Sequence, residues 1–286
     1  METIALYILN GLSWGMLLFL ISLGLTTVFG VLGVLNFAHG SLFMLGAYFS
    51  LQIMRLSNNF WLALVFAPIF VAIVGAIIER FILKRVYRRN VSYQLLITFG
   101  ILLILDDSVR LIWGPAYHVI DPPQILSGSI NVFGRAYPVY RFFLIVVGPI
   151  LGIFIWAFFS FTRLGKVIRA AAFDREMAAG IGIDVNKLFT LVFGFGTYLA
   201  ALGGALAAPH QSVGPAMGER VIIESFIVVV IGGLGSYPGA FVGALVLGIV
   251  ESFGTAFAGP AQMALPYMLL AFVLLVRPRG LFGKEV

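Results

Sequence analysis

Apolar runs of membrane-spanning length repeat along this chain, and most of the charged residues lie between them. A helix that crosses a bilayer needs about 20 consecutive apolar residues. Only 10% of the 286 residues are charged, against about 25% in a soluble domain, so the surface suits lipid rather than water. The runs that are long enough lie at 5–28, 60–83, 91–113, 138–162, 187–208, 239–257 and 261–276.

Two further apolar segments, at 41–56 and 221–234, are shorter and border glycine-rich sequence. The runs are apolar on every face, unlike barrel strands, and helices satisfy the backbone in lipid. We therefore predict an all-α integral membrane protein, a polytopic helical bundle with eight or nine membrane segments, some of them broken or re-entrant. Residues 1–286 are expected to form a single transmembrane domain whose first run is retained rather than cleaved as a signal peptide.

Glycines recur at four-residue spacing within several of these runs. This spacing lets two helix backbones approach closely in lipid. The pattern predicts tightly packed helix pairs at Gly11/Gly15, Gly148/Gly152 and Gly239/Gly243.

Most lysines and arginines lie in the loop 84–90, the stretch 163–187 and the tail after 276. The loops expected on the opposite side of the membrane hold only Arg55, Arg135 and Arg220. By the positive-inside rule, the three basic segments and the C-terminus face the cytoplasm. This topology accounts for the net charge of +6, so no nucleic acid is needed as a partner. The side of the membrane on which the N-terminus lies stays open, because it depends on how residues 30–40 cross the membrane.

The stretch 163–187 mixes charged residues with alanines and places apolar side chains near helical spacing. This pattern predicts a short amphipathic helix on the membrane surface, ended by Gly180 and Gly182. The segment either docks a soluble cytoplasmic partner or merely joins two spans as a solvated loop. We favour docking, because long loops in compact proteins usually have a function.

Polar residues interrupt apolar sequence at Asn36–Ser41. This stretch is either a broken helix that lines a solute path or a helix turn at the inner surface. A second interruption, Gly233–Gly239, follows about 200 residues later, and paired interruptions in two halves indicate a central transport site. It is either a tight turn before a helix opened by Pro238 or part of that path. The translocation-path candidates are Asn36, His39, Gly40, Ser41, Gly233, Gly235 and Ser236.

Several acidic residues lie within or near apolar runs. Asp106 is placed to pair with Arg110 one turn later. Glu224 and Glu251 either bridge helices or relay protons in an ion-coupled carrier, and we favour the structural interpretation. Two of the three histidines fall in outer loops and the chain has no cysteine, so we predict no metal site and no cofactor.

Four stretches together resemble the permease subunits of branched-chain amino acid ABC importers, of the LivH type. They are GLTTVFGVLGVLNFAHGSLFMLGAY at 24–48, the segment 163–187, GGLGSYPGAFVGALVLGIVES at 232–252 and the ending RPRGLFGK at 277–284. The resemblance implies a subunit of the bacterial inner membrane that moves a small-molecule solute by alternating access. It also implies four kinds of contact besides the lipid bilayer: a homologous second permease, two cytoplasmic ATP-binding subunits, an extracytoplasmic solute-binding protein and the solute.

By the same resemblance, the helix near 166–180 is the coupling helix that seats in an ATPase cleft. The coupling candidates are Arg163, Lys166, Arg169, Asp174 and Glu176. The stretch Gly280–Glu285 lacks the spacing of a phosphate-binding loop, so we predict a transport subunit without its own ATPase site and not an enzyme. The rival is a stand-alone ion-coupled carrier or channel, and a membrane-embedded enzyme ranks last. The solute stays open, as a branched-chain amino acid or a similar small organic molecule.

Overall fold

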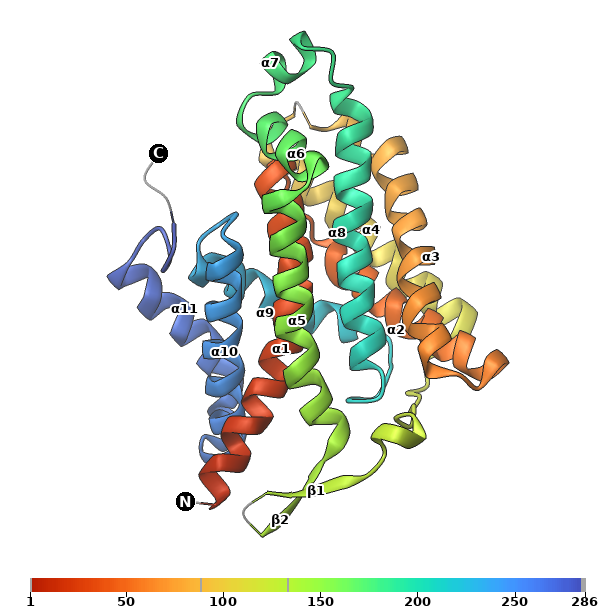
Figure 1. The fold of residues 1–286 in the computed structure, drawn as a ribbon, viewed down its shortest axis with the longest axis vertical. Helices are drawn as coiled ribbons and strands as arrows, with labels where there is room; N and C mark the ends of the chain where they lie inside the picture. Colours follow the sequence, from red (N-terminus) through yellow and green to blue (C-terminus); the bar gives the residue numbers. More distant parts are fainter. Residues whose placement is uncertain (1, 88, 133, 284–286) are drawn as a thin grey trace.

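The computed structural model describes residues 2–87, 89–132 and 134–283, and long helices dominate it (Figure 1). The basic residues Arg88 and Lys284 lie outside the described residues. In chain order the elements are α1 (Glu2–Leu32), α2 (Ala38–Ser57), α3 (Phe60–Phe81), η1 (Leu83–Arg85), α4 (Val91–Trp113), η2 (Gln124–Leu126), β1 (Ser129–Val132), β2 (Arg135–Pro138), α5 (Val139–Phe161), α6 (Arg163–Phe173), α7 (Arg175–Gly180), α8 (Val185–Ala207), α9 (Met217–Gly232), α10 (Tyr237–Phe257), η3 (Gly259–Ala264) and α11 (Leu265–Val276).

Within the described residues, six helical stretches are long and apolar enough to cross a membrane. They confirm the predicted class, a helical membrane bundle, but not the predicted count of eight or nine segments. The predicted segments at 41–56, 91–113 and 221–234 correspond to α2, α4 and α9, which are not among the six. α9 has 16 residues, or about 24 Å of helix, against about 30 Å of hydrocarbon. The six stretches are Thr3–Leu32, Phe60–Arg85, Val139–Phe161, Val185–Ala207, Tyr237–Phe257 and Gly259–Val276.

Burial separates the central helices from those that face lipid. In the most apolar 18-residue window of α1, 89% of the residues are buried, and in that of α8 the share is 78%. The corresponding share is 22% in α5, whose outer face exposes Ile150, Ile153 and Phe154. α1 and α8 therefore form the centre of the bundle.

The two ends of the bundle differ. At one end, which we call the coupling end, α6 and α7 project beyond most of the long helices (Figure 1). The N-terminus and the β1–β2 hairpin lie at the opposite end, which we call the hairpin end (Figure 1). α1 therefore runs from the hairpin end to the coupling end, and α8 runs the other way.

The helices before α5 and after α7 form two corresponding sets. α1 packs extensively along α10, as α3 packs along α8. α2 contacts α3 and α4, as α9 contacts α10 and α11. The matched order pairs α1 with α8, α2 with α9, α3 with α10 and α4 with α11. Because α1 and α8 run in opposite directions, the two sets have inverted topology, an arrangement that in transporters places the solute site where the repeats meet.

This pairing changes the predicted correspondence between the two sequence interruptions. Residues 33–37 join α1 to α2, so their counterpart is 208–216, which joins α8 to α9. The second predicted interruption is instead the turn between α9 and α10. Pro209, Gly214 and Pro215 are the chain-breaking residues that mark the true counterpart.

The predicted glycine pairs all lie in helix interfaces. A Cβ atom added at Gly15 would lie 2.8 Å from the carbonyl oxygen of Ala244 in α10. Side chains at these positions would therefore separate the helices, as the spacing predicts. Gly11 and Gly15 face α10, Gly148 and Gly152 face Met16 and Phe19 of α1, and Gly239 and Gly243 face Gly232 and Val228 of α9.

Candidate functional site

The chain leaves helical conformation at residues 33–37 and turns back into the bundle. Gly33 adopts φ = 68°, a left-handed conformation that costs glycine little because it lacks a Cβ atom. Nε2 of His39 lies 3.1 Å from the carbonyl oxygen of Ile21. The stretch from Ile21 to Leu32 is about 16 Å long at 1.5 Å per residue, so α2 begins inside the bundle. This geometry fits the interpretation as a broken helix, and its role in a solute path stays a prediction.

The predicted path residues of this break are buried. Asn36, His39 and Ser41 are each 0% exposed. Ser41 Oγ donates a hydrogen bond to Oδ1 of Asp106 in α4, 2.8 Å away, whereas neither amide atom of Asn36 has a hydrogen-bond partner among the described residues. An unpaired buried polar group costs about 1–3 kcal/mol, and polar groups at membrane depth are usually functional.

Asp106 does not pair with Arg110 as predicted. Nη1 of Arg110 lies 3.7 Å from Oδ1 of Asp107, and Asp106 points to Ser41 instead. Positions i+3 and i+4 lie on the same helix face, so the spacing alone does not choose between the two aspartates.

α2 and α9 cross at a glycine pair in their first turns. A Cβ atom at Gly40 would lie 2.2 Å from the carbonyl oxygen of Gly218, and one at Gly218 would lie 2.6 Å from that of Gly40. Beside this crossing the rings of Phe37 and Phe226 lie 5.0 Å apart. Because α2 and α9 are counterparts, the two inverted sets meet at their broken helices.

Gly233, Gly235 and Ser236, the remaining path candidates, lie in the turn between α9 and α10. Ser236 Oγ accepts a hydrogen bond from the Gly239 amide at 3.1 Å and caps α10. A Cβ atom at Gly30, near the C-terminus of α1, would lie 3.5 Å from Cα of Gly235. This turn thus lies against the last turns of α1 and against residues 280–283, whereas Asn36–Ser41 contacts Ile21, α4 and α9, so the structure does not gather the candidates into one group.

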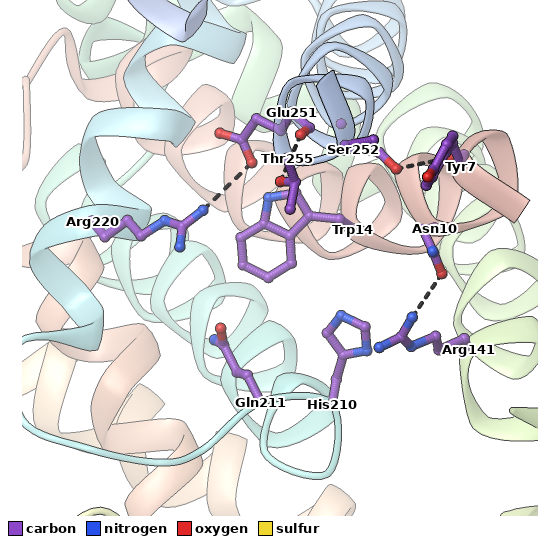
Figure 2. Close-up of a pocket in the computed structure, with 12 residues that line it drawn as sticks. Tyr7, Asn10, Trp14, Arg141, His210, Gln211, Arg220, Glu251, Ser252 and Thr255 are labelled. Carbon is purple, nitrogen blue, oxygen red and sulfur yellow. Dashed lines mark hydrogen bonds and ion pairs between the residues drawn. The ribbon is translucent and has the colours of Figure 1, made fainter. Parts of the chain in front are cut away.

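Arg220 and Glu251 line a cavity between α1, α5, α9 and α10 (Figure 2), and together with Glu224 they form a charged cluster. Nε of Arg220 lies 2.6 Å from Oε1 of Glu224, and Nη2 of Arg220 lies 3.7 Å from Oε2 of Glu251. The Arg220 guanidinium also lies 5.8 Å from the ring centre of Trp14. The Trp14 ring is nearly parallel to that of His210, and the ring centres are 6.1 Å apart. Glu251 therefore bridges α10 to α9 through Arg220, whereas Glu224 pairs with Arg220 within α9. Sequence reasoning treated Arg220 only as a basic residue of an outer loop.

The amphipathic segment is two helices rather than the predicted one. Thr162 caps α6, and Asp174 ends it and caps α7 by accepting a hydrogen bond from the Met177 amide at 2.9 Å. The α7 helix ends at Gly180, as predicted. Beyond it, the Lys187 amide donates to Asp184 at 3.1 Å, and this hydrogen bond holds the pKa of the Asp184 carboxyl below its ordinary value.

The coupling candidates occupy different surroundings. Arg163 and Lys166 on α6 and Glu176 on α7 are exposed. Arg169 donates a hydrogen bond to the Phe159 carbonyl of α5, so it anchors α6 to the bundle. Asp174 is engaged as the cap of α7.

Sequence reasoning missed an exposed apolar surface at the tip of this segment. Phe173 is 95% exposed, Met177 69% and Ile181 72%, and we call these three residues the tip patch. Ile168 and Ala171, by contrast, turn inward and are buried. The sequence did carry an indication of this surface, because apolar residues recur at four-residue spacing. They are more numerous than the single apolar face of an amphipathic helix requires.

Arg175 joins this segment to the end of α1. Its Nη2 donates a hydrogen bond to the carbonyl oxygen of Leu32 at 2.7 Å, and its guanidinium lies 4.8 Å from the ring centre of Phe189. The last carbonyls of a helix have no partner within the helix, and a cation there is favoured by the helix dipole. Arg175 therefore holds the last residue of α1 beside the break at 33–37.

Comparison with known proteins assigns the fold to a family. The protein family described as the branched-chain amino acid transport system permease component matches residues 7–276. The chain is 30% identical to the high-affinity branched-chain amino acid transport system permease protein LivH of Salmonella typhimurium, over 96% of this chain and 94% of LivH. It is 34% identical to the corresponding protein BraD of Pseudomonas aeruginosa, over 97% of this chain and 95% of BraD.

A weaker match is the permease protein LivM of Escherichia coli, 22% identical over 93% of this chain and 68% of LivM. The LivH protein of the same organism is 30% identical to this chain. These matches extend over nearly the whole chain and confirm the resemblance seen in four stretches. The chain belongs to the family of permease components of branched-chain amino acid transport systems.

Proposed function

We propose that this chain is the transmembrane permease subunit of an ABC importer for branched-chain amino acids or a similar small organic solute. The observation that carries the proposal is the arrangement of the α6–α7 segment. Its tip patch is exposed, and Arg175 donates a hydrogen bond to the last residue of α1. A stand-alone carrier has no need of a surface of this kind, whereas a subunit driven by a soluble partner does. The names of the relatives LivH and BraD support the choice of solute.

The proposed mechanism begins with the ATP-binding subunits. Their closure on ATP displaces the α6–α7 segment, and Arg175 transmits the displacement to Leu32 and the adjoining break. The α2–α9 crossing then shifts, so that the path opens towards one side of the membrane at a time. In this scheme the coupling end and the C-terminus face the cytoplasm of a bacterial cell, and the N-terminus and the hairpin end face outward.

Partners complete the proposed importer. The Escherichia coli relatives LivH and LivM are both named as permeases of high-affinity branched-chain amino acid transport, which supports a homologous second permease beside this chain. Two cytoplasmic ATP-binding subunits would dock at the coupling end. A solute-binding protein would deliver the solute at the hairpin end.

Purification from the native operon tests this proposal. We expect a second permease and two ATP-binding subunits to co-purify with this chain, and we expect the solute-binding protein to stimulate ATP hydrolysis in nanodiscs. A chain that purifies alone and moves solute along an ion gradient without ATP would instead establish the stand-alone carrier.

Replacing Arg175 by alanine tests the link between the coupling segment and the break. Hydrogen bonds to charged groups contribute about 1.5–3 kcal/mol, so transport is expected to fall by roughly tenfold or more. Because the tip patch is unchanged, the ATP-binding subunits should still co-purify with the variant. Arg135→Ala in the exposed hairpin is the matched control. Transport at the wild-type rate by the Arg175→Ala variant would disprove the link.

A further inference from the structure

A second cavity adjoins the one that the charged cluster lines. The first has a volume of about 480 Å³, and the second, between α9, α10, η3 and α11, has about 640 Å³. Arg220, Glu251 and Thr255 line both. Each cavity is large enough for a small organic molecule, and the charged cluster stands at the boundary between them.

The cluster contains more carboxyl groups than guanidinium groups. One guanidinium faces two carboxylates, Glu224 and Glu251. Glu224 is only 5% exposed, and its Oε2 atom has no hydrogen-bond partner among the described residues. A buried carboxylate oxygen left unpaired is costly, so the site favours an additional cationic donor such as an ammonium group.

The cation of the cluster is accessible. The Arg220 side chain is 69% exposed, although its Nε and Nη2 already face the two glutamates. A guanidinium has five N–H donors arranged as a fork, so its remaining edge suits a carboxylate. Positive and negative partners are thus available within one site.

The second cavity adds an apolar wall. It is lined by Ile223, Ile227, Met263 and Pro266 as well as by the charged residues. A molecule with its ammonium group at Glu224 and Glu251 and its carboxylate at Arg220 would have an apolar surface beside it for an aliphatic side chain. Burying such a side chain is favourable in proportion to the apolar area removed from water.

We propose that Arg220, Glu224 and Glu251 form a binding site for a zwitterionic aliphatic amino acid on the hairpin side of the permease. The ammonium group binds the two glutamates, the carboxylate binds Arg220, and the side chain lies along Ile223 and Ile227. This inference rests on the proposed function and adds a site at which the permease itself recognises the solute.

Equilibrium binding of radiolabelled leucine tests the site, with the intact permease–ATPase complex in nanodiscs and without the solute-binding protein. Isoamylamine lacks the carboxylate of leucine, and 4-methyl-2-oxopentanoate lacks the ammonium group. We expect leucine to displace the label at roughly tenfold lower concentration than either analogue, the effect of about 1.4 kcal/mol.

Substitutions assign each charge to its partner. Glu251→Gln is expected to weaken leucine binding by roughly tenfold and to leave the oxoacid unaffected, because the oxoacid has no ammonium group. Arg220→Lys keeps the charge but loses the fork, so it should weaken leucine and leave isoamylamine unaffected. The control is Asp107→Asn, which removes a carboxylate that lies outside both cavities and is 73% exposed. Co-elution of all subunits shows that each variant assembles.

The outcomes separate the site from the proposed function. If the complete wild-type importer transports leucine but the complex binds none without the solute-binding protein, the site is overturned and the function stands. Equal leucine affinity in Glu251→Gln and Asp107→Asn overturns it as well. If the complete importer transports another small organic solute but no amino acid, the site is overturned and the importer function stands. If the chain moves solute without ATP-binding subunits, the proposed function is overturned.

Discussion

Replacing Gly40 by alanine is expected to abolish transport and to lower the stability of the assembled permease. The added Cβ atom would lie 2.2 Å from the carbonyl oxygen of Gly218 and 2.7 Å from Cβ of Ile222. Neither neighbour is the end of a flexible side chain, so α2 and α9 must move apart. Overpacking of this kind costs about 1–3 kcal/mol, and here it acts where the two inverted sets meet.

Thermal unfolding in detergent and solute uptake in proteoliposomes would measure the two effects of Gly40→Ala. The matched control is Gly100→Ala, because a Cβ atom at Gly100 in α4 has nothing within 4 Å. Gly218→Ala should behave like Gly40→Ala. The double variant should lose less stability than the sum of the losses in the two single variants, because both changes separate the same helices. Wild-type uptake by Gly40→Ala would show that the crossing is not needed for transport.

The double substitution Phe173→Ser and Met177→Ser is expected to detach the ATP-binding subunits. Both side chains belong to the tip patch and are 95% and 69% exposed, so their removal leaves no cavity in the bundle. Buried anchor residues at interfaces contribute about 2 kcal/mol or more each, so the loss of both predicts an affinity lower by roughly several hundredfold.

Co-purification of the ATP-binding subunits and their stimulated ATP hydrolysis are the measurements for this double variant. Ala179→Ser places the same hydroxyl group on an exposed position of α7 and serves as the control. If the double variant retains its ATP-binding subunits and full stimulation, the tip patch is not their docking surface.

Features set by short stretches of sequence were predictable. Apolar length identified the helices, and the four-residue spacing of Gly11 and Gly15 predicted a close helix interface, which the structure places against α10. The end of α7 at Gly180 followed from the same local chemistry. Each of these depends on residues within one or two helical turns, so the sequence contains the whole signal.

Features set by contacts between distant segments were not predictable. Glu251 is 31 positions from Arg220, and only the packing of α9 on α10 brings these two residues together. The hydrogen bond from Arg175 to Leu32 spans 143 positions. The counterpart of the break at 33–37 was predicted at the wrong place for the same reason. Gly233–Ser236 resembles that break in its glycines, but 208–216 is the segment that occupies the corresponding position in the order of the helices. Spacing describes neighbours along one helix and gives no information on which helices meet.

The inverted pairing of the helices bears on the direction of transport. A core made of two oppositely oriented copies of one arrangement looks alike from both faces of the membrane, so its own geometry gives no preference for inward or outward movement. α5, α6 and α7 lie between the two sets and have no counterpart among the described elements. We infer that the direction of solute movement originates in this unpaired insertion. It makes one face of the otherwise reversible core responsive to an external source of energy.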